Sequence, residues 1–272
     1  MIDPPKAKKK NAEPRRIKSI EVGFRILRVL QEAEGKMSLR DIASRVNMHA
    51  SNVYLYLASF VYEGVAEQDP ATSHYGLGPA AIQLGAAALR QSSLIDLAKG
   101  ELAALREETR NSVMLSVWGN RGPTIVFKID GDAYGVLGIR VGHVLPLLTS
   151  TTGRVFLTFI PEEQWKGLVE IERSANITLG GSMNGQVGDI AIPDIVAPVK
   201  SQGLSCMDGE INGRYPSCAA PIFDQAGQLC AVVTMLINHA GAPDAGTMRG
   251  MNEKLLSTTR ALSRKLGHLA GY

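Results

Sequence analysis

A run of hydroxyl-bearing residues stands between an apolar, strand-like segment and an apolar helical pattern. It reads Thr149-Ser150-Thr151-Thr152-Gly153-Arg154. The first turn of a helix has backbone N–H groups without internal partners and carries the positive end of the helix dipole. Together with the hydroxyls, these groups predict a site for a small anion. Gly153 allows a ligand or another backbone segment to approach closely. The alternative is that the Ser and Thr side chains only cap the helix.

A second set of polar residues lies on one face of a helix predicted over about 50–63. At 100° per residue, the inward face contains Ala50, Val53, Leu57, Phe60 and Val61. The outward face contains Met48, Ser51, Asn52, Leu55, Ser59 and Tyr62, with His49 and Tyr56 at its flanks. Ser, Asn, Tyr and His can hydrogen-bond to base edges and phosphates in a DNA major groove. The alternative is an ordinary solvated surface, since the face has no Lys or Arg.

The neighbouring residues predict the unit that positions this helix. Apolar residues at helical spacing indicate a first helix over about 19–33, and Ser38 caps a short second helix. A turn of three or four residues then leads into the third helix, which is typical of a helix-turn-helix. A hairpin with Asp69-Pro70 in its turn follows Gly64. Residues 19–78 are therefore predicted to form a winged helix-turn-helix, and we count Ser38, Arg40 and His74 among its DNA contacts.

The rest of the chain alternates helical and strand-like segments. Pro79 opens a small apolar helix at 79–91, and we expect residues 79–92 to act as a linker helix that packs on a partner. Strands are predicted at 112–118, 124–129, 135–139, 144–148, 204–209, 217–223 and 229–237. Helices are predicted at about 94–109, 152–160, 190–202 and 245–268, with a Gly-rich stretch at 180–188. This mixture predicts an α+β domain over residues 93–272.

Three cysteines, Cys206, Cys218 and Cys230, are spaced evenly by 12 residues. Their odd number argues against a disulfide framework, and the lack of a C-x-x-C motif argues against a metal site. We expect ordinary buried or partly buried thiols. An alternative is an enzyme with Cys218 or Cys206 as nucleophile, but no nucleophile, P-loop or metal signature accompanies these residues. The sequence predicts neither a cofactor nor an enzyme.

Composition excludes several classes of protein. The 272 residues are 45% hydrophobic and 20% charged, with a mean hydropathy of +0.01, unlike a disordered, collagen-like or disulfide-dense chain. No apolar run suits a membrane span or a signal peptide, so we expect a cytoplasmic protein without a membrane partner. Residues 1–18 carry seven Lys and Arg against two acidic residues, whereas residues 19–92 and 93–272 each net −1. The excess positive charge therefore lies on a predicted basic, disordered arm.

Motifs along most of the chain resemble one family. Ser38-Leu-Arg-Asp-Ile-Ala and the stretches Met48 to Phe60 and Gly64 to Gly78 resemble the winged helix of IclR-type bacterial transcriptional regulators. Resemblance to the effector domain of that family is carried by Leu145 to Pro161, Gly203 to Glu210 and Ala219 to Leu229. Each motif is modest alone, but their shared order over roughly residues 19–268 is specific.

The resemblance implies a winged helix joined by a linker helix to a GAF-like effector domain, in a homodimer or homotetramer that binds operator DNA. The family often has Lys at the position of Ala50 and very often Arg at that of Leu55. Each missing phosphate contact lowers the salt dependence of DNA binding by about one unit of slope. Leu55 can instead meet a thymine methyl group, and the basic arm can supply phosphate contacts.

The resemblance also implies that the hydroxyl-rich loop forms part of an effector pocket. The matching positions are Thr151, Thr152, Gly153, Met207, Asp208, Tyr215, Ser217, Thr234 and Leu236. Relatives tend to have Asp-Asp where this chain has Met207-Asp208, and a Ser-x-Ser pair where it has Thr234-Met235-Leu236. The pocket is therefore less polar than in those relatives. We expect a carboxylate with an apolar or aromatic body, held by the amides of Thr151 and Thr152.

These observations predict a sequence-specific DNA-binding transcriptional regulator whose operator binding is modulated by a small organic acid. A second interpretation keeps the ligand-sensing domain but has the winged helix contact proteins, while the basic arm binds nucleic acid without specificity. The motifs do not decide between activation and repression.

Overall fold

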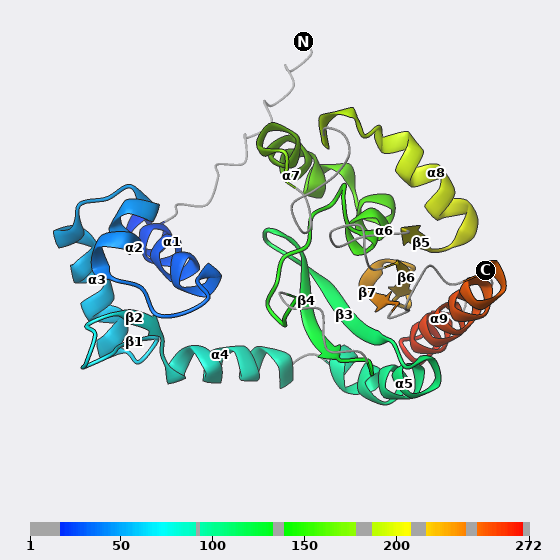
Figure 1. Ribbon diagram of the computed structural model, residues 1–272, viewed down its shortest axis with the longest axis horizontal. Helices are drawn as coiled ribbons and strands as arrows, with labels where there is room; N and C mark the ends of the chain where they lie inside the picture. The colour runs from blue at the N-terminus through cyan, green and yellow to red at the C-terminus, as the bar shows by residue number, and fades with distance from the viewer. Residues whose placement is uncertain are drawn as a thin grey trace, which may run out of the picture. The chain divides into compact units, whose positions relative to one another are not determined.

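The computed structural model describes residues 17–90, 93–132, 139–177, 187–207, 216–237 and 244–268 (Figure 1). The chain divides into two compact units, Met1–Gln91 and Ser92–Tyr272, and each has its own hydrophobic core. Residues 1–16, which make up most of the predicted basic arm, lie outside the described residues. Within the described ranges, no helix is both long enough and apolar enough to cross a bilayer.

Three helices and a hairpin form a winged helix-turn-helix in the first unit. The elements are α1 (Lys18–Glu32), α2 (Leu39–Val46), α3 (Ala50–Tyr62), β1 (Ala66–Gln68) and β2 (Tyr75–Leu77), followed by α4 (Pro79–Arg90). Ser38 caps α2 by accepting a hydrogen bond from the Asp41 N–H, and Asn47 ends α2 in the left-handed conformation with φ at 54°. This sharp turn allows α3 to begin only three residues later, at Ala50.

One narrow stripe of each helix forms the core of this unit. The fully buried residues are Ile26 of α1, Ile42 of α2, and Val53 and Leu57 of α3. The spacing of four between Val53 and Leu57 keeps both side chains on the same side of α3. The opposite side of α3 is thereby left at the surface.

The prediction that Ala50 and Val61 also face inward is wrong. Ala50 is exposed and Val61 retains 38% exposure, whereas Phe60 is half-buried. Phe60 packs closely on α1 because Gly23 has no side chain, and a Cβ at Gly23 would lie 2.8 Å from the Phe60 ring. The contact between α1 and α3 is therefore made beside a glycine, and the two ends of α3 stay outside it.

Asp69 organises the turn between β1 and β2. Its Oδ1 accepts hydrogen bonds from the N–H groups of Ala71 at 2.9 Å and Thr72 at 3.0 Å, and these bonds lower the pKa of Asp69. Lys36 pairs with Glu67 of β1 at 2.9 Å, which joins the hairpin to the segment between α1 and α2. The wing is thus fixed to the helical part of the unit.

An antiparallel five-stranded sheet in the order β4-β3-β7-β6-β5 forms the centre of the second unit. The strands are β3 (Ser112–Gly119), β4 (Gly122–Ile129), β5 (Ser205–Met207), β6 (Ser217–Phe223) and β7 (Leu229–Leu236). Helices α5 (Ser93–Thr109) and α9 (Ala245–Lys265) cover one face, and α6 (Thr151–Phe159) packs on the other (Figure 1). The remaining helices are α7 (Glu162–Ala175), the short η1 (Val187–Asp189) and α8 (Ile192–Gln202). The predicted α+β class is confirmed.

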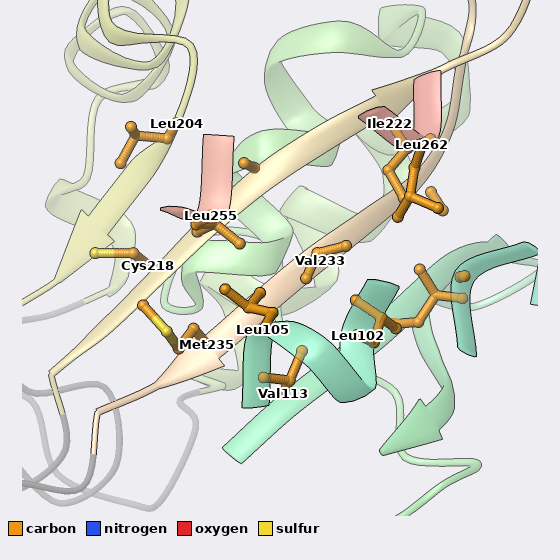
Figure 2. Packing of buried hydrophobic residues seen from close by; sticks show 14 of the residues in the cluster. Leu102, Leu105, Val113, Leu204, Cys218, Ile222, Val233, Met235, Leu255 and Leu262 are labelled. Atoms are coloured by element: carbon orange, nitrogen blue, oxygen red, sulfur yellow. The ribbon is translucent and has the colours of Figure 1, made fainter. Parts of the chain in front are cut away.

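Alternate residues of the sheet enter two separate cores. Figure 2 shows one of them, in which Leu105 of α5, Val233 of β7 and Leu255 of α9 meet. The other core lies against α6, where Phe156 packs near Val232 of β7. Because β6 and most of β7 are buried on both faces, polar side chains on these strands need partners within the protein or a ligand.

Two element predictions for this unit differ from the structure. Residues 144–148 were expected to form a strand, but only Val144 makes an isolated bridge, to Thr124. The sequence predicts no helix at the position of α7, which follows α6 after only Ile160 and Pro161. Part of the strand expected at 135–139 and most of the Gly-rich stretch at 180–188 lie outside the described residues.

Candidate DNA-binding surface and effector site

The side of α3 that faces away from the core presents four residues in succession along the helix. Ser51, Asn52, Leu55 and Ser59 are all exposed, and Leu55 retains 65% of its accessible surface. We call these four residues the recognition face. Along its length, α3 contains no Lys or Arg. This face therefore offers hydrogen-bonding and apolar groups but no cation.

The other predicted DNA contacts surround the recognition face in different environments. His49 is the exposed N-cap residue of α3, without a side-chain capping bond, and Tyr56 is half-buried. Arg40 is exposed in the first turn of α2, whereas Ser38 is half-buried and donates its hydroxyl proton to Asp41 Oδ2 at 2.7 Å. His74 is half-buried directly before β2.

One member of the recognition face is already engaged. The Ser59 hydroxyl donates to the Leu55 carbonyl oxygen of its own helix at 3.0 Å. Its lone pairs can still accept a hydrogen bond, but its proton is used internally. Ser51 and Asn52 are therefore the residues of this face best suited to donate to a base edge.

The hydroxyl-rich loop places its side chains at the start of α6, as the sequence suggested. Ser150 is the N-cap, and its Oγ accepts from the Gly153 N–H at 2.9 Å while donating to the Pro146 carbonyl at 2.6 Å. Ser150 therefore performs the capping role. The hydroxyls of Thr151 and Thr152 point elsewhere.

These two threonines reach across to the sheet. The Thr151 hydroxyl lies 3.2 Å from that of Ser217 on β6, and the Thr152 hydroxyl lies 2.6 Å from that of Thr234 on β7. All four side chains are fully buried. A buried polar cluster thus joins the positive end of α6 to strands β6 and β7.

The strand register brings further predicted residues to the same place. Ser217 is paired with Met207 of β5 on one side and with Leu236 of β7 on the other. Directly paired residues point to the same face of a sheet, so Met207 and Leu236 flank the hydroxyl cluster with apolar side chains. Met207 is half-buried and Leu236 is fully buried. Asp208 and Tyr215 lie outside the described residues.

Gly153 serves the packing of its own loop. A Cβ at this position would collide with the carbonyl oxygen of Pro146 and with the Cα of Leu147. The sequence left open whether Gly153 admits a ligand or another backbone segment, and the structure favours the backbone. A residue with any side chain would push the loop off the first turn of α6.

A buried carboxylate that sequence reasoning missed holds the same loop. Glu172 of α7 is 7% exposed and accepts from the N–H groups of Leu147 at 2.6 Å and Leu148 at 3.0 Å. Burial raises the pKa of Glu172, and the two backbone hydrogen bonds oppose that rise. No local motif marks this residue, because its partners lie 25 and 24 residues earlier in the chain.

Two buried hydroxyls near α6 have no hydrogen-bond partner within the described part of the chain. They are Thr149 Oγ1, which immediately precedes the N-cap, and Ser116 Oγ on β3. By register Ser116 faces the same side of the sheet as Val232, which packs in the core beneath α6. Buried hydroxyls normally bond to protein, water or ligand, so both are available to a polar group that enters this side of the domain.

The expectation of three ordinary thiols is wrong for two of the cysteines. Cys206 and Cys218 form a disulfide, and their Cα atoms are 4.2 Å apart. The reason is the antiparallel register, which places these two residues directly opposite each other on β5 and β6. Counting cysteines could not show this pairing, because it depends on how distant segments align.

Thiol chemistry is poorly supported as an alternative. Cys206 and Cys218 are bonded to each other, and burial raises the pKa of the remaining thiol, Cys230, to about 11. A nucleophilic cysteine needs a lowered pKa and a nearby base. Among the residues that the structure describes, no group of His, Cys, Asp and Glu is arranged to hold a metal ion.

A winged helix-turn-helix followed by an α+β domain defines a class of two-part DNA-binding transcriptional regulators. Residues 19–70 match the IclR helix-turn-helix domain, and residues 86–264 match the C-terminal domain of the bacterial transcriptional regulator IclR. The chain belongs to the IclR family of bacterial transcriptional regulators, as the sequence motifs predicted.

Similar proteins match the chain over nearly its full length. The HTH-type transcriptional regulator XynR of Escherichia coli strain K12 is 24% identical over 255 residues, covering 93% of this chain and 99% of XynR. The crystal structure of Pseudomonas aeruginosa HmgR is 34% identical, with a TM-score of 0.54, and the match covers 94% of this chain and 100% of HmgR. An IclR homologue from Microbacterium hydrocarbonoxydans, complexed with 4-hydroxybenzoate, shares the fold with a TM-score of 0.72 at 19% identity, covering 91% of this chain and 98% of the homologue.

Proposed function

We propose that this regulator reads its operator with the recognition face of α3. The observation that supports this is an exposed row of Ser51, Asn52 and Leu55 on the side of α3 that faces away from its core. In a helix-turn-helix, the second helix lies in the major groove and the first crosses the backbone. Arg40 of α2 then contacts phosphate, and His74 of the hairpin contacts the backbone beside it. Residues 19–78 act as the DNA-binding domain.

The α+β domain, residues 93–272, binds a small organic acid with an apolar or aromatic body. The observation that carries this proposal is the meeting of Thr151 and Thr152 with Ser217 and Thr234 at the start of α6. A helix start favours a carboxylate, because the dipole and the first N–H groups act on negative charge. Met207 and Leu236 beside Ser217 supply apolar contact for the body of the ligand.

This ligand class agrees with one known relative of the same fold. The Microbacterium hydrocarbonoxydans homologue is complexed with 4-hydroxybenzoate, which is a carboxylate on an aromatic ring. In this chain, the apolar pair Met207 and Leu236 favours such a body over a very small polar acid. The hydroxyls of Thr149 and Ser116, which have no hydrogen-bond partner among the described residues, can take a further polar group.

Assembly of two or more copies connects the two activities. Helix α4, the proposed linker over residues 79–92, leaves Ile82 at 73% and Leu84 at 65% exposure, and a second copy can cover these side chains. The protein therefore acts as a homodimer or homotetramer in the cytoplasm. An effector that binds one arrangement of the assembly more tightly changes operator affinity by no more than that difference in binding energy.

Thermal-shift screening of the full chain tests the effector proposal. Aromatic and aliphatic carboxylates should raise the unfolding temperature, and the matching primary amides should not. A ligand at 100 times its Kd stabilises the folded state by about 2.7 kcal/mol, which is readily measured. Stabilisation by neutral or cationic compounds, without any effect of carboxylates, would overturn this ligand class.

Footprinting on the DNA that flanks the gene tests operator binding. A protected site that competes out with itself but not with random DNA is the expected result, and a hit from the carboxylate screen should change its protection. Binding equal to that of random DNA would instead support the non-specific interpretation.

A further inference from the structure

The centre of the recognition face is apolar. Leu55 is 65% exposed, with Ser51 and Asn52 one turn before it and Ser59 one turn after it. A single exposed leucine is ordinary on a protein surface and means little by itself. Its position among three small polar residues on the helix proposed to enter the major groove makes it informative.

The groups around Leu55 narrow the bases that this face can favour. A guanine is most often read by a bidentate Arg or Lys, and α3 has neither. The hydroxyl proton of Ser59 is committed to the Leu55 carbonyl, and Tyr56 is half-buried close to Gly23 of α1. Asn52 is exposed and has the two-pronged amide that pairs with adenine N6 and N7.

The apolar group that the major groove offers to an apolar side chain is the C5-methyl group of thymine. We infer that Leu55 selects thymine in each operator half-site by contact with this methyl group, while Asn52 pairs with a neighbouring adenine. This inference rests on the proposed role of α3 in operator recognition. It gives the half-site an A·T-rich centre that is read without any cation.

Sequence selection and electrostatic attraction are then assigned to different helices. Arg40 and Arg45 are exposed on α2, which crosses the DNA backbone in this arrangement. Removing either arginine should reduce the salt dependence of binding by about one unit of slope and leave base preference unchanged. Removing the Leu55 side chain should change the base preference and leave the salt dependence of binding unchanged.

The test removes single methyl groups from the DNA. Within the footprint, each thymine is replaced in turn by uracil, which keeps every hydrogen-bonding group and lacks only the C5-methyl. For the wild-type chain, one substitution per half-site should weaken binding about fourfold, the value of one buried methylene-sized group. For Leu55→Ala, the same DNA substitution should have no effect.

Val61→Ala is the matched control, because Val61 is an exposed aliphatic residue elsewhere on α3. This variant should keep the full methyl dependence. Melting temperatures of both variants verify that they fold. The inference is overturned if no single methyl matters to the wild-type chain, or if the decisive methyl matters equally to Leu55→Ala.

Asn52→Ala and Ser51→Ala separate this inference from the proposal beneath it. Weakened operator binding in these variants, without coupling between Leu55 and a methyl group, would reject the thymine contact alone. Unchanged operator binding in Ser51→Ala, Asn52→Ala and Leu55→Ala would mean that α3 does not read the operator. The DNA-binding proposal for this face would then fail as well.

Discussion

The hydroxyl oxygens of Thr152 and Thr234 lie 2.6 Å apart, although 82 residues separate them in the sequence. Both side chains are fully buried, so this hydrogen bond ties the first turn of α6 to the middle of β7 without help from solvent. Replacing one partner by Val keeps the shape but leaves the other hydroxyl unsatisfied. We expect Thr152→Val to lower the free energy of unfolding by about 1–3 kcal/mol.

Urea unfolding of the single and double variants measures this pair. Thr152→Val with Thr234→Val removes both polar groups, and it should be more stable than the sum of the single losses implies. Strict additivity would show that the hydroxyls do not depend on each other. The pair lies in the proposed effector site. Both single variants and the double variant should therefore also bind more weakly to a carboxylate that stabilises the wild type in the thermal-shift screen.

Gly153→Ala should destabilise the effector domain by about 1–3 kcal/mol, because the added Cβ collides with the backbone at Pro146 and Leu147. The matched control is Gly167→Ala on α7, where a Cβ meets nothing within 4 Å. That substitution should stabilise the helix by about 0.5–1 kcal/mol. Denaturant midpoints that move the same way for both variants would contradict this explanation of Gly153.

The pH dependence of stability should report Glu172. Its folded-state pKa is raised above its usual value by burial, so the folded chain holds this proton more tightly than the unfolded chain does. The stabilising contribution is fully present below the unfolded pKa and is lost as pH rises through the folded pKa. As the pH rises above about 4, the stability of the wild type relative to Glu172→Gln should therefore fall.

Urea titrations at several pH values check this sign. Glu170→Gln, on the exposed side of the same helix, removes an equal charge without touching the loop at Leu147. The stability of wild type relative to this control should change much less across the range. A rising difference for Glu172→Gln would mean that the two backbone hydrogen bonds outweigh burial.

Thiol counting tests the bond between Cys206 and Cys218. Denatured protein prepared without reductant should show one reactive thiol, Cys230, and reduced protein should show three. Reduction should lower the free energy of unfolding by about 3 kcal/mol, as expected for a closed loop of about 15 residues. Cys230→Ala should keep this sensitivity to reductant, whereas Cys218→Ala should lose it.

The basic arm should supply much of the electrostatic attraction to DNA. Deleting residues 1–16 removes six Lys and Arg but leaves Lys18, the first residue of α1, in place. We expect the same footprint, lower affinity and a shallower dependence of affinity on salt. An unchanged affinity and slope in electrophoretic mobility shift measurements would exclude the arm from DNA binding.

Local signals made the helix-turn-helix predictable. Ser38 and Asn47 mark the ends of α2, and Asp69 marks the hairpin turn, so spacing alone located α3. The prediction that Ala50 and Val61 are buried is wrong because helical periodicity shows which side of α3 faces the core. It does not show how wide the contact between α3 and its neighbouring helices is. That width depends on Gly23 of another helix.

The effector domain was less predictable, because its decisive contacts are distant in sequence. The apolar run at 144–148 has the composition of a strand, yet the N–H groups of Leu147 and Leu148 bond to Glu172 instead of to a neighbouring strand. No residue pattern near Glu172 in the sequence predicts that it accepts these two hydrogen bonds. The pairing of Cys206 with Cys218 depends likewise on the register of β5 with β6.

The bond between Cys206 and Cys218 also changes the connectivity of the polypeptide. Together with the backbone from residue 206 to residue 218 it closes a covalent ring, so the chain is not a simple line at this point. A proteolytic cut inside that ring breaks the backbone but releases no fragment. On a gel run without reductant, protein nicked there would retain the mass of the whole chain.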